Sequence, residues 1–563
     1  MPTAAGRSRK PSSHHQEVNG FNPALISGDL LERRLLRLAI DLGAERVGGR
    51  LSEGEARLIT EGREEVQTDR HTIERIEAAI LLGEDPLGAA IYEARSAVMR
   101  RSLGAFFTPP ELVEPMLDWT FEQGFDCLVD PGCGSGRFVA GAVRRRPNLH
   151  VIAIDIDPLS TLFTRAALRI IGASSATVLN ANYTSILPSE ISGRTAFVGN
   201  PPYVRHHDLT STAKDWMVAG ARRLGYKASA LAGLHAHFFL ATALLGQPGD
   251  IGCFVTSSEW LDVNYGSIIR SLLLDGLGCQ ALYSVDPHAL PFDETMTTAL
   301  ITCFAIGTSV DTWRVREVER LDELGSLSEG SFVARSAFAK VHRWSPLVRR
   351  LQNDSPLDGG VPLRTIARVH RGAVTGANDF FILSRERARQ LGVDRWCRPA
   401  ITSAEEILKS SGCIRDLPTG KLLLDVPKDV NRADHPELDA YLRLGEQPWN
   451  GGPPVSKRYI PSHRRPWWWL GLPHAPPIVA TYMARQAPVF AVNPNQLALV
   501  NIGHGLYPVR NLNTDESQEL VRLLNSSRDS FRGRGRTYHG GLEKFEPREM
   551  ENLPIAANGA WLR

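Results

Sequence analysis

The fold of this 563-residue chain is decided by Cys127-Leu-Val-Asp130-Pro-Gly132-Cys-Gly134-Ser-Gly-Arg-Phe138. An apolar run ends in an acid, glycines follow at alternate positions, and a helical pattern then begins. Alternating glycines let a ligand approach the backbone closely, and a helix N-terminus offers free N–H groups. The glycine interval differs from the dinucleotide fingerprint, and a carboxylate at the strand tip repels phosphate but attracts a cation. The stretch therefore predicts a strand, a glycine loop and a helix that bind a cationic ligand.

The next predicted strand also ends in acids. The run Val151-Ile-Ala-Ile-Asp155-Ile-Asp157-Pro158 places them about twenty residues later, where doubly wound sheets hold the two hydroxyls of a ribose. A nucleoside ligand that is positively charged and lacks phosphate is S-adenosylmethionine. Asp155 and Asp157 also fit two simpler interpretations, which are solvated turn acids and a pair of metal ligands.

Further apolar runs extend the sheet. Leu179 to Tyr183 and Ala196 to Gly199 each read as a strand that ends in polar residues. Later segments predict a helix at 231–245 and strands at 251–256, 279–285 and 298–306. Strand tips in this order, with helices between them, predict an α/β fold: a doubly wound sheet with a ligand across its carboxyl edge.

Directly after the run that ends at Gly199 comes Asn200-Pro201-Pro202-Tyr203. The two prolines fix φ and remove two N–H donors, so this loop is stiff and keeps free carbonyl acceptors. Asn200 adds an amide oxygen and Tyr203 a flat aromatic face. Two acceptors and a stacking ring suit the binding of a planar exocyclic amine. Taken alone, the tetrapeptide equally fits a proline-rich turn with a packed tyrosine.

Four motifs together resemble the N6-adenine DNA methyltransferases of restriction–modification systems: Gly104-Ala-Phe-Phe-Thr108-Pro-Pro110, Asp130 to Gly136, Asp155 to Pro158, and Asn200 to Tyr203. The Thr-Pro-Pro element comes first and a long tail follows, which is similar to the gamma arrangement of TaqI-like type. The resemblance covers roughly residues 100–310 with specific motifs and the tail only loosely. It implies a class I methyltransferase sheet, S-adenosylmethionine as cofactor, double-stranded DNA as partner, and a companion restriction endonuclease.

The resemblance also assigns roles to residues. Asn200 and the Pro201 carbonyl would accept from the two N6 hydrogens of a flipped-out adenine, while Pro202 belongs to the same catalytic loop. Tyr203 would stack on the base, with Phe292 on its far face, although Phe292 also fits simple packing under a hairpin. The cofactor-binding residues would be Thr108, Asp130, Gly132, Gly134, Asp155, Asn182 and Tyr183. Asn182 departs from the aspartate that the family often has there.

Composition sets broad limits. The net charge of +2 produces no overall field that would draw the protein to nucleic acid, so a DNA-binding surface must come from local clusters. The seven cysteines form no Cys-x-x-Cys pair, which suits reduced thiols. Residues 1–20 lack an apolar core of a signal peptide, and no apolar run reaches spanning length. We therefore expect a soluble cytoplasmic protein, and the resemblance implies a prokaryotic host and no resident metal.

The chain divides by composition into four parts. Residues 1–25 are predicted to be a disordered arm, and 26–103 a helical segment that resembles the cap of related enzymes. The catalytic domain is expected at 104–320 and a linker at 321–331. The part at 335–563 is expected to be an α+β target-recognition domain.

Basic clusters provide the candidate DNA contacts. After Tyr203, a segment that reads as a mobile loop runs to Lys227, and loops of this composition often close over a bound strand. The tail adds three groups of arginines with glycine and aromatic residues, which suit a surface that follows a phosphate backbone. Each cluster alone is also typical of ordinary surface. The candidates are Arg205, Arg222, Arg371, Arg464, Arg465, Arg534 and Arg536.

Three other functions use parts of the same pattern. Protein-glutamine methyltransferases also have an Asn-Pro-Pro-Tyr loop, because a side-chain amide is another planar nitrogen, and RNA-base methylation needs similar chemistry. The protein-glutamine methyltransferases require neither the Thr-Pro-Pro element nor the long basic-aromatic tail. A DNA-binding subunit of a restriction complex would not need intact methyl-transfer motifs.

Overall fold

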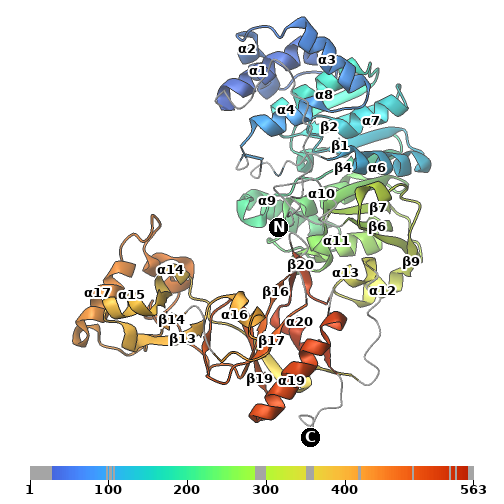
Figure 1. Ribbon diagram of the computed structural model, residues 1–563. Coiled ribbons are helices and arrows are strands. Elements are labelled where there is room, and N and C mark those ends of the chain that lie inside the picture. Colours follow the sequence, from blue (N-terminus) through green and yellow to red (C-terminus); the bar gives the residue numbers. More distant parts are fainter. Residues whose placement is uncertain are drawn as a thin grey trace, which may run out of the picture. The chain divides into compact units, whose positions relative to one another are not determined.

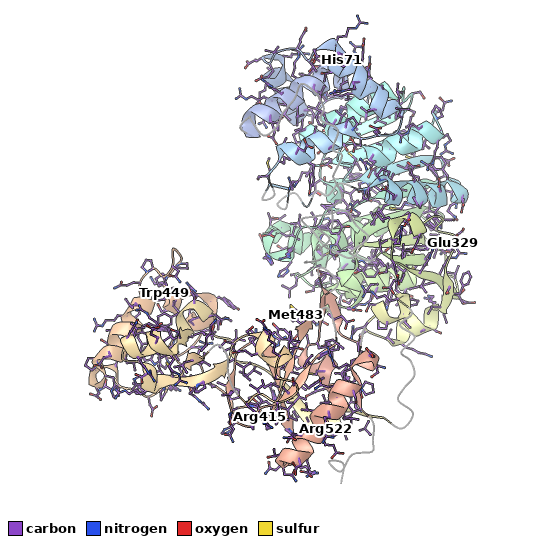
Figure 2. All side chains as sticks on the ribbon, viewed as in Figure 1. His71, Glu329, Arg415, Trp449, Met483 and Arg522 are labelled. Atoms are coloured by element: carbon purple, nitrogen blue, oxygen red, sulfur yellow. The ribbon has the colours of Figure 1, made fainter. Side chains whose placement is uncertain are left out.

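The computed structural model describes residues 28–96, 99–100, 104, 108–285, 299–349, 360–415, 420–484, 487–531, 534–538 and 542–555. Within these ranges the side chains of residues 28–30, 190, 484, 536–538 and 542 are not described. The chain forms two compact units, and the division falls between Val348 and Arg349 (Figures 1 and 2). No described helix is long and apolar enough to cross a membrane.

A nine-stranded sheet forms the centre of the first unit, with strand order β3-β2-β1-β4-β5-β7-β6-β8-β9. The first five strands in this order run parallel: β3, β2, β1, β4 and β5. Strand β7 is antiparallel to both β5 and β6. This confirms the predicted doubly wound α/β fold. The strands are β1 Cys127–Pro131, β2 His150–Asp155, β3 Ala176–Asn180, β4 Thr195–Gly199, β5 Ile251–Ser257, β6 Cys279–Val285, β7 Ala299–Ala305, β8 Thr312–Val318 and β9 Ser331–Ala334.

Helices cover this sheet, and its side chains belong to two main core clusters. One cluster joins the sheet to helices represented by Met217 and Phe239, and the other joins it to helices represented by Met116 and Val139. Alternate residues of a strand point to opposite faces, so a central strand such as β1 supplies Val129 to one cluster and Leu128 to the other. The helices are α6 Pro110–Gln123, α7 Arg137–Arg145, α8 Pro158–Ile170, α9 Ser211–Arg223, α10 Leu234–Leu245, α11 Ser267–Ser271, α12 Arg335–Lys340 and α13 Ser345–Val348.

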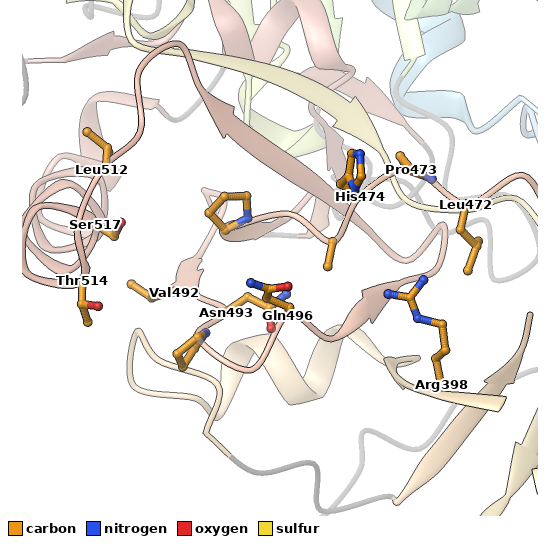
Figure 3. Close-up of a pocket in the computed structure, with 13 residues that line it drawn as sticks. Arg398, Leu472, Pro473, His474, Val492, Asn493, Gln496, Leu512, Thr514 and Ser517 are labelled. Carbon is orange, nitrogen blue, oxygen red and sulfur yellow. The ribbon is translucent and has the colours of Figure 1, made fainter. Parts of the chain in front are cut away.

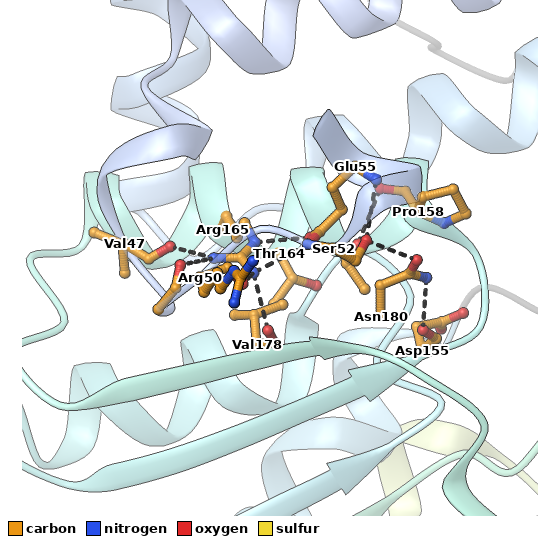
Figure 4. A network of polar contacts seen from close by, with 12 residues as sticks. Val47, Arg50, Ser52, Glu55, Asp155, Pro158, Thr164, Arg165, Val178 and Asn180 are labelled. Carbon is orange, nitrogen blue, oxygen red and sulfur yellow. Dashed lines mark hydrogen bonds and ion pairs between the residues drawn. The ribbon is translucent and has the colours of Figure 1, made fainter. Parts of the chain in front are cut away.

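Four helices precede the sheet and lie in the segment where a helical pattern is expected: α1 Gly28–Asp41, α2 Glu53–Arg63, α3 Arg70–Leu81 and α4 Pro86–Ala94. They form one hydrophobic cluster with Leu162 and Phe163 of α8. A buried ion pair reinforces it, because Arg165 Nε lies 2.8 Å from Glu55 Oε1 and neither side chain is exposed (Figure 4). Removing one partner of such a pair generally costs about 3–5 kcal/mol, because the other charge is then left buried without a partner.

Two sequence-based expectations in the first unit differ from the structure. The segment 321–331 is not a linker, because Ser331–Ala334 forms strand β9, paired with β8, and residues up to Val348 remain in this unit. Trp344 and Phe338 pack on Trp313 there, with ring centroids 5.3 and 4.6 Å away. The segment after Tyr203 is not a continuous loop either. Thr210 caps helix α9, whose Met217 and Ala221 face the core.

The second unit has an α+β composition, as expected, with two larger sheets. One has strand order β11-β19-β15-β17 and shares a core with α19 and α20, and the other has order β12-β14-β13-β18 and shares a core with α14 and α17. Its helices are α14 Asn378–Phe381, α15 Arg385–Gln390, α16 Ala404–Leu408, α17 Pro436–Gly445, α18 Tyr459–Ser462, α19 Thr514–Ser526 and α20 Pro547–Glu551. Its strands are β10 Val361–Pro362, β11 Ala367–Arg371, β12 Ile382–Ser384, β13 Cys397–Ile401, β14 Lys421–Leu424, β15 Ile478–Thr481, β16 Met483–Ala484, β17 Phe490–Val492, β18 Ala498–Leu499, β19 Gly503–Pro508, β20 Arg536–Tyr538, β21 Leu542–Lys544 and β22 Pro554–Ile555.

Candidate active site

The tip of β1 carries a buried carboxylate. Asp130 is completely buried, and apart from the backbone N–H of Val139, which approaches its carboxylate, neither of its oxygens has a hydrogen-bond partner among the described residues. Burial, together with the nearby charge of Asp155, raises the pKa of Asp130 well above its usual range. The loop that follows requires glycine, since Gly132 and Gly134 have φ values of 75° and 57°. Unpaired buried carboxylate oxygens are costly, so a cationic or hydrogen-donating ligand would stabilise this site.

The two acids at the tip of β2 have different partners and opposite pKa shifts. Asp155 accepts hydrogen bonds from the backbone N–H groups of Gly134 and Asp157, each at 2.9 Å, which join the glycine loop to this strand. Burial, and then the charge of Asp157, raises the pKa of Asp155 to about 6. Asp157 caps α8 and lies 2.8 Å from Arg95. Burial alone would raise the pKa of Asp157, but Arg95 outweighs it and holds the pKa below its usual value.

The third tip carries two predicted cofactor-binding residues, both of which have partners within the protein. The side-chain oxygen of Asn182 accepts from the backbone N–H of Thr184 at 3.0 Å. Tyr183 is buried, its hydroxyl lies 2.9 Å from Thr242 Oγ1, and its ring packs on Phe238 at 5.1 Å. Packing thus occupies the Tyr183 ring that the sequence predicts beside a cofactor.

Phe238 is a residue that the sequence reasoning missed. A Cβ atom placed on Gly132 would lie 3.7 Å from the Phe238 ring and 3.5 Å from Pro202, so the glycine loop, α10 and the proline loop meet there. In the sequence, Phe238 belongs to an apolar helical run that gives no sign of a site. Only the packing of α10 brings it to the strand tips.

The proline loop holds the candidate catalytic amide. Asn200 Nδ2 donates to Thr108 Oγ1 at 3.0 Å, while Asn200 Oδ1 is buried without a partner among the described residues. The backbone N–H of Tyr203 donates to the carbonyl of Gly104 at 3.1 Å. Gly104 has φ 62°, and a Cβ there would lie only 2.7 Å from Tyr203 N, so this close approach requires glycine. Two motifs about ninety residues apart in sequence are therefore in direct contact.

Comparison with known proteins shows the family to which this chain belongs. Residues 190–288 match the Eco57I restriction-modification methylase family, and residues 346–561 match the C-terminal domain of Type II methyltransferase M.Eco57I. Type II methyltransferase M.XamI from Xanthomonas campestris pv. amaranthicola is 41% identical over 457 residues, which cover 80% of this chain and 85% of the relative. The chain belongs to the Type II restriction–modification methyltransferases. Its cofactor is S-adenosylmethionine.

Two further similarities lie at greater distance. Type II methyltransferase M.AccI from Acinetobacter calcoaceticus is 22% identical over 474 residues, covering 80% of this methyltransferase and 85% of the relative. Among solved structures, the Type IIL restriction-modification enzyme MmeI in complex with DNA has a TM-score of 0.55 at 15% identity, covering 88% of this chain and 76% of that chain. At this identity the match shows a shared fold.

The predicted DNA contacts of the methyltransferase lie in different surroundings. Arg205 and Arg222 are exposed in the first unit. In the second unit Arg371 pairs with Glu546, and three further arginines donate to backbone carbonyls: Arg464 to Thr375 at 3.1 Å, Arg465 to Ser462 at 2.8 Å, and Arg534 to Ser530 at 2.8 Å. Phe292 and the side chain of Arg536 lie outside the described residues. The aromatic part of the basic run also packs inward, because Trp467 lies 5.6 Å from the buried Phe380 ring, between ring centroids.

A cavity of about 870 Å³ opens in the second unit (Figure 3). Arg398, His474 and Gln496 line it together with Thr514 and Ser517 of α19. It shares no residue with the strand tips of the first unit, so we do not assign it to methyl transfer.

Proposed function

We propose that this methyltransferase transfers a methyl group from S-adenosylmethionine to the N6 atom of a flipped-out adenine in duplex DNA. The observation that carries the proposal is the orientation of Asn200. Its amide nitrogen is held by Thr108, and its oxygen is buried without a partner among the described residues, next to a strand edge that bears two carboxylates. An oxygen in this state is poised to accept a hydrogen from an exocyclic amine.

The chain's own residues would activate and hold that amine. Asn200 Oδ1 and the Pro201 carbonyl accept one N6 hydrogen each, which draws the nitrogen away from planar geometry and frees its lone pair. Pro202 keeps the loop stiff, since its φ is restricted. Tyr203 stacks on the base, with Phe292 proposed for the other face, and stacking of this kind contributes about 1–3 kcal/mol per base. The rate of methyl transfer then depends chiefly on how well these residues position the N6 atom against the methyl group.

The strand tips fit the cofactor. When bound, S-adenosylmethionine supplies an electrophilic methyl group on a positively charged sulfur. Asp130 offers a buried carboxylate without a side-chain partner among the described residues to a cationic ligand, and Asp155 offers acceptors to the ribose hydroxyls. We keep Thr108, Gly132, Gly134, Asn182 and Tyr183 as proposed lining residues, with Tyr183 acting through the packing of its ring.

DNA is the proposed substrate, because the MmeI structure that shares this fold was determined in complex with DNA. Exposed arginines that could contact phosphates are present in the first unit at Arg205 and Arg222. The second unit is proposed as the target-recognition domain. A companion restriction endonuclease and a cytoplasmic location complete the proposal.

Modified DNA from a host tests the proposal directly. We expect expression in a bacterium without adenine methylation to produce N6-methyladenine at one defined sequence, detected by mass spectrometry of nucleosides and by sequencing. DNA from cells with the empty vector is the control. Methylated cytosine without N6-methyladenine, or methyl transfer only to protein or RNA, would contradict the proposed substrate.

The raised pKa of Asp155 predicts a pH-dependent affinity for the cofactor. Its charged form accepts from the ribose hydroxyls, so affinity is full above about pH 7 and falls as the pH drops through about 6. The loss approaches about tenfold per pH unit. Asp155→Asn should weaken binding at pH 8 and flatten this dependence, as measured by titration calorimetry. Equal pH profiles for both proteins would remove Asp155 from the cofactor site.

A further inference from the structure

One carboxylate of the helical segment lies against the glycine loop. Asp85 caps α4, and its Oδ1 accepts from the backbone N–H of Gly88 at 2.8 Å. Its second oxygen, Oδ2, accepts from Ser135 Oγ at 2.6 Å and from Arg137 Nε at 3.3 Å. Ser135 belongs to the glycine loop and Arg137 begins α7. A single side chain thus joins α4 to the loop beside the cofactor site.

The contact continues from Arg137 to the catalytic loop. Arg137 Nη1 donates to the backbone carbonyl of Thr108, and Thr108 Oγ1 accepts from Asn200 Nδ2 at 3.0 Å. Water has little access to these groups, because the side chains of Asp85 and Arg137 are 11% and 13% exposed and Thr108 is buried. Four residues therefore form an unbroken chain of polar contacts from Asp85 to Asn200.

Packing holds the start of this chain tightly. A Cβ atom on Gly88 would lie 2.3 Å from Asp85 Oδ2 and 2.7 Å from Ser135 Oγ, distances that real Cβ atoms do not reach. Any side chain at position 88 would therefore displace Asp85 or Ser135. Hydrogen bonds shielded from water and close packing together restrict a side chain strongly.

We propose that Asp85 is a positioning residue for methyl transfer, through which the N-terminal helical segment orients Asn200. Asp85 holds Arg137, Arg137 holds the backbone of Thr108, and Thr108 holds the amide whose oxygen accepts from the target amine. Small displacements of such groups reduce rate strongly, since a shift of about 1 Å costs up to about 10²-fold. The inference rests on the proposed role of Asn200.

The alternative is that Asp85 only attaches the helices to the domain, and a second ion pair provides the control. Glu77 of α3 pairs with Arg169 of α8 at 2.5 Å, with side chains 31% and 33% exposed. This pair also joins the helical segment to the sheet domain. It shares no residue with the path from Asp85 to Asn200. Glu77→Ala therefore removes a link of the same kind without disturbing that path.

The experiment compares Asp85→Ala, Asp85→Asn, Gly88→Ala and Glu77→Ala in the full chain. Transfer of tritiated methyl groups to unmethylated genomic DNA gives kcat and KM, and calorimetry gives the Kd for S-adenosylmethionine. We expect Asp85→Ala to lower kcat about tenfold or more while Kd changes less than about threefold. Asp85→Asn should recover part of kcat because its amide oxygen still accepts, and Gly88→Ala should lower kcat as well. Glu77→Ala should keep the wild-type kcat.

Two results would overturn the inference. The first is a wild-type kcat in both Asp85→Ala and Gly88→Ala; the second is a loss in Glu77→Ala equal to that in Asp85→Ala. If Asp85→Ala does not fold, Asp85→Asn and Gly88→Ala still decide the question through kcat. An inactive Asn200→Ala beside fully active Asp85→Ala and Gly88→Ala would refute only this inference. An active Asn200→Ala would refute the proposed function itself.

Discussion

Asn200→Ala is expected to abolish methyl transfer and leave cofactor binding close to that of the wild type. Asn200→Ala removes one described interaction of the free protein, the hydrogen bond from Nδ2 to Thr108 Oγ1 at 3.0 Å, whereas the side-chain oxygen has no partner among the described residues. In the proposed reaction it accepts a hydrogen of the target amine, an interaction that matters in the transition state. Removal of a single preorganised polar group of this kind typically costs about 10²–10³ in kcat.

The measurement combines calorimetry with S-adenosylmethionine and a tritiated-methyl assay on unmethylated genomic DNA. Asn148→Ala is the control, because it removes an exposed amide of the first unit that lies outside the proposed site and whose oxygen accepts from Ser174 Oγ at 3.1 Å. It should keep most of the activity. Near-normal turnover in Asn200→Ala would contradict the mechanism, and a parallel loss of cofactor binding would mean that Asn200 supports the cofactor site instead.

The residues of the site that could be predicted from the sequence are those that a short local pattern identifies. Asp130, Asp155 and Asn200 each follow an apolar run, and parallel strands bring their carboxyl ends to one edge of a sheet, so their proximity follows from topology. The contacts of Thr108 and Gly104 with the proline loop could be anticipated only by resemblance. No local pattern shows that Gly104 must approach Tyr203 within van der Waals distance.

The parts that could not be predicted depend on tertiary packing. Asp85 caps a helix, as many aspartates do, and only the attachment of α4 brings it to Ser135, fifty residues away. Residues 321–331 are rich in glycine, serine and acids, as linkers are, and only their packing, with Leu324 and Leu327 buried in the core, shows that they belong to the sheet domain. Composition also does not reveal that Arg371 pairs with Glu546 or that Arg464 donates to the carbonyl of Thr375, and the DNA contacts of both arginines stay predictions.

The corrected boundary changes the design of a shortened protein. A chain that ends after Val348 keeps the whole nine-stranded sheet, whereas one that ends at Ser331 loses the partner of β8 together with Phe338 and Trp344. The shorter version would expose the Trp313 face of the core, and we expect it to aggregate. The version that ends after Val348 should remain folded, so it can be used to test whether site-specific DNA binding requires the second unit.

The shortened protein that ends after Val348 is expected to bind S-adenosylmethionine with unchanged affinity and to lose site-specific DNA binding. Recognition is assigned to the second unit, while the strand tips lie entirely in the first. Exposed arginines such as Arg205 would leave weak, salt-sensitive affinity, since non-specific binding is mainly electrostatic. Specific sites are generally bound about 10³-fold or more tightly than random DNA, so a competition gel would show the loss clearly. Thermal melting and calorimetry establish that the protein is folded, and if it then still methylates one defined sequence, the first unit must contain the recognition surface.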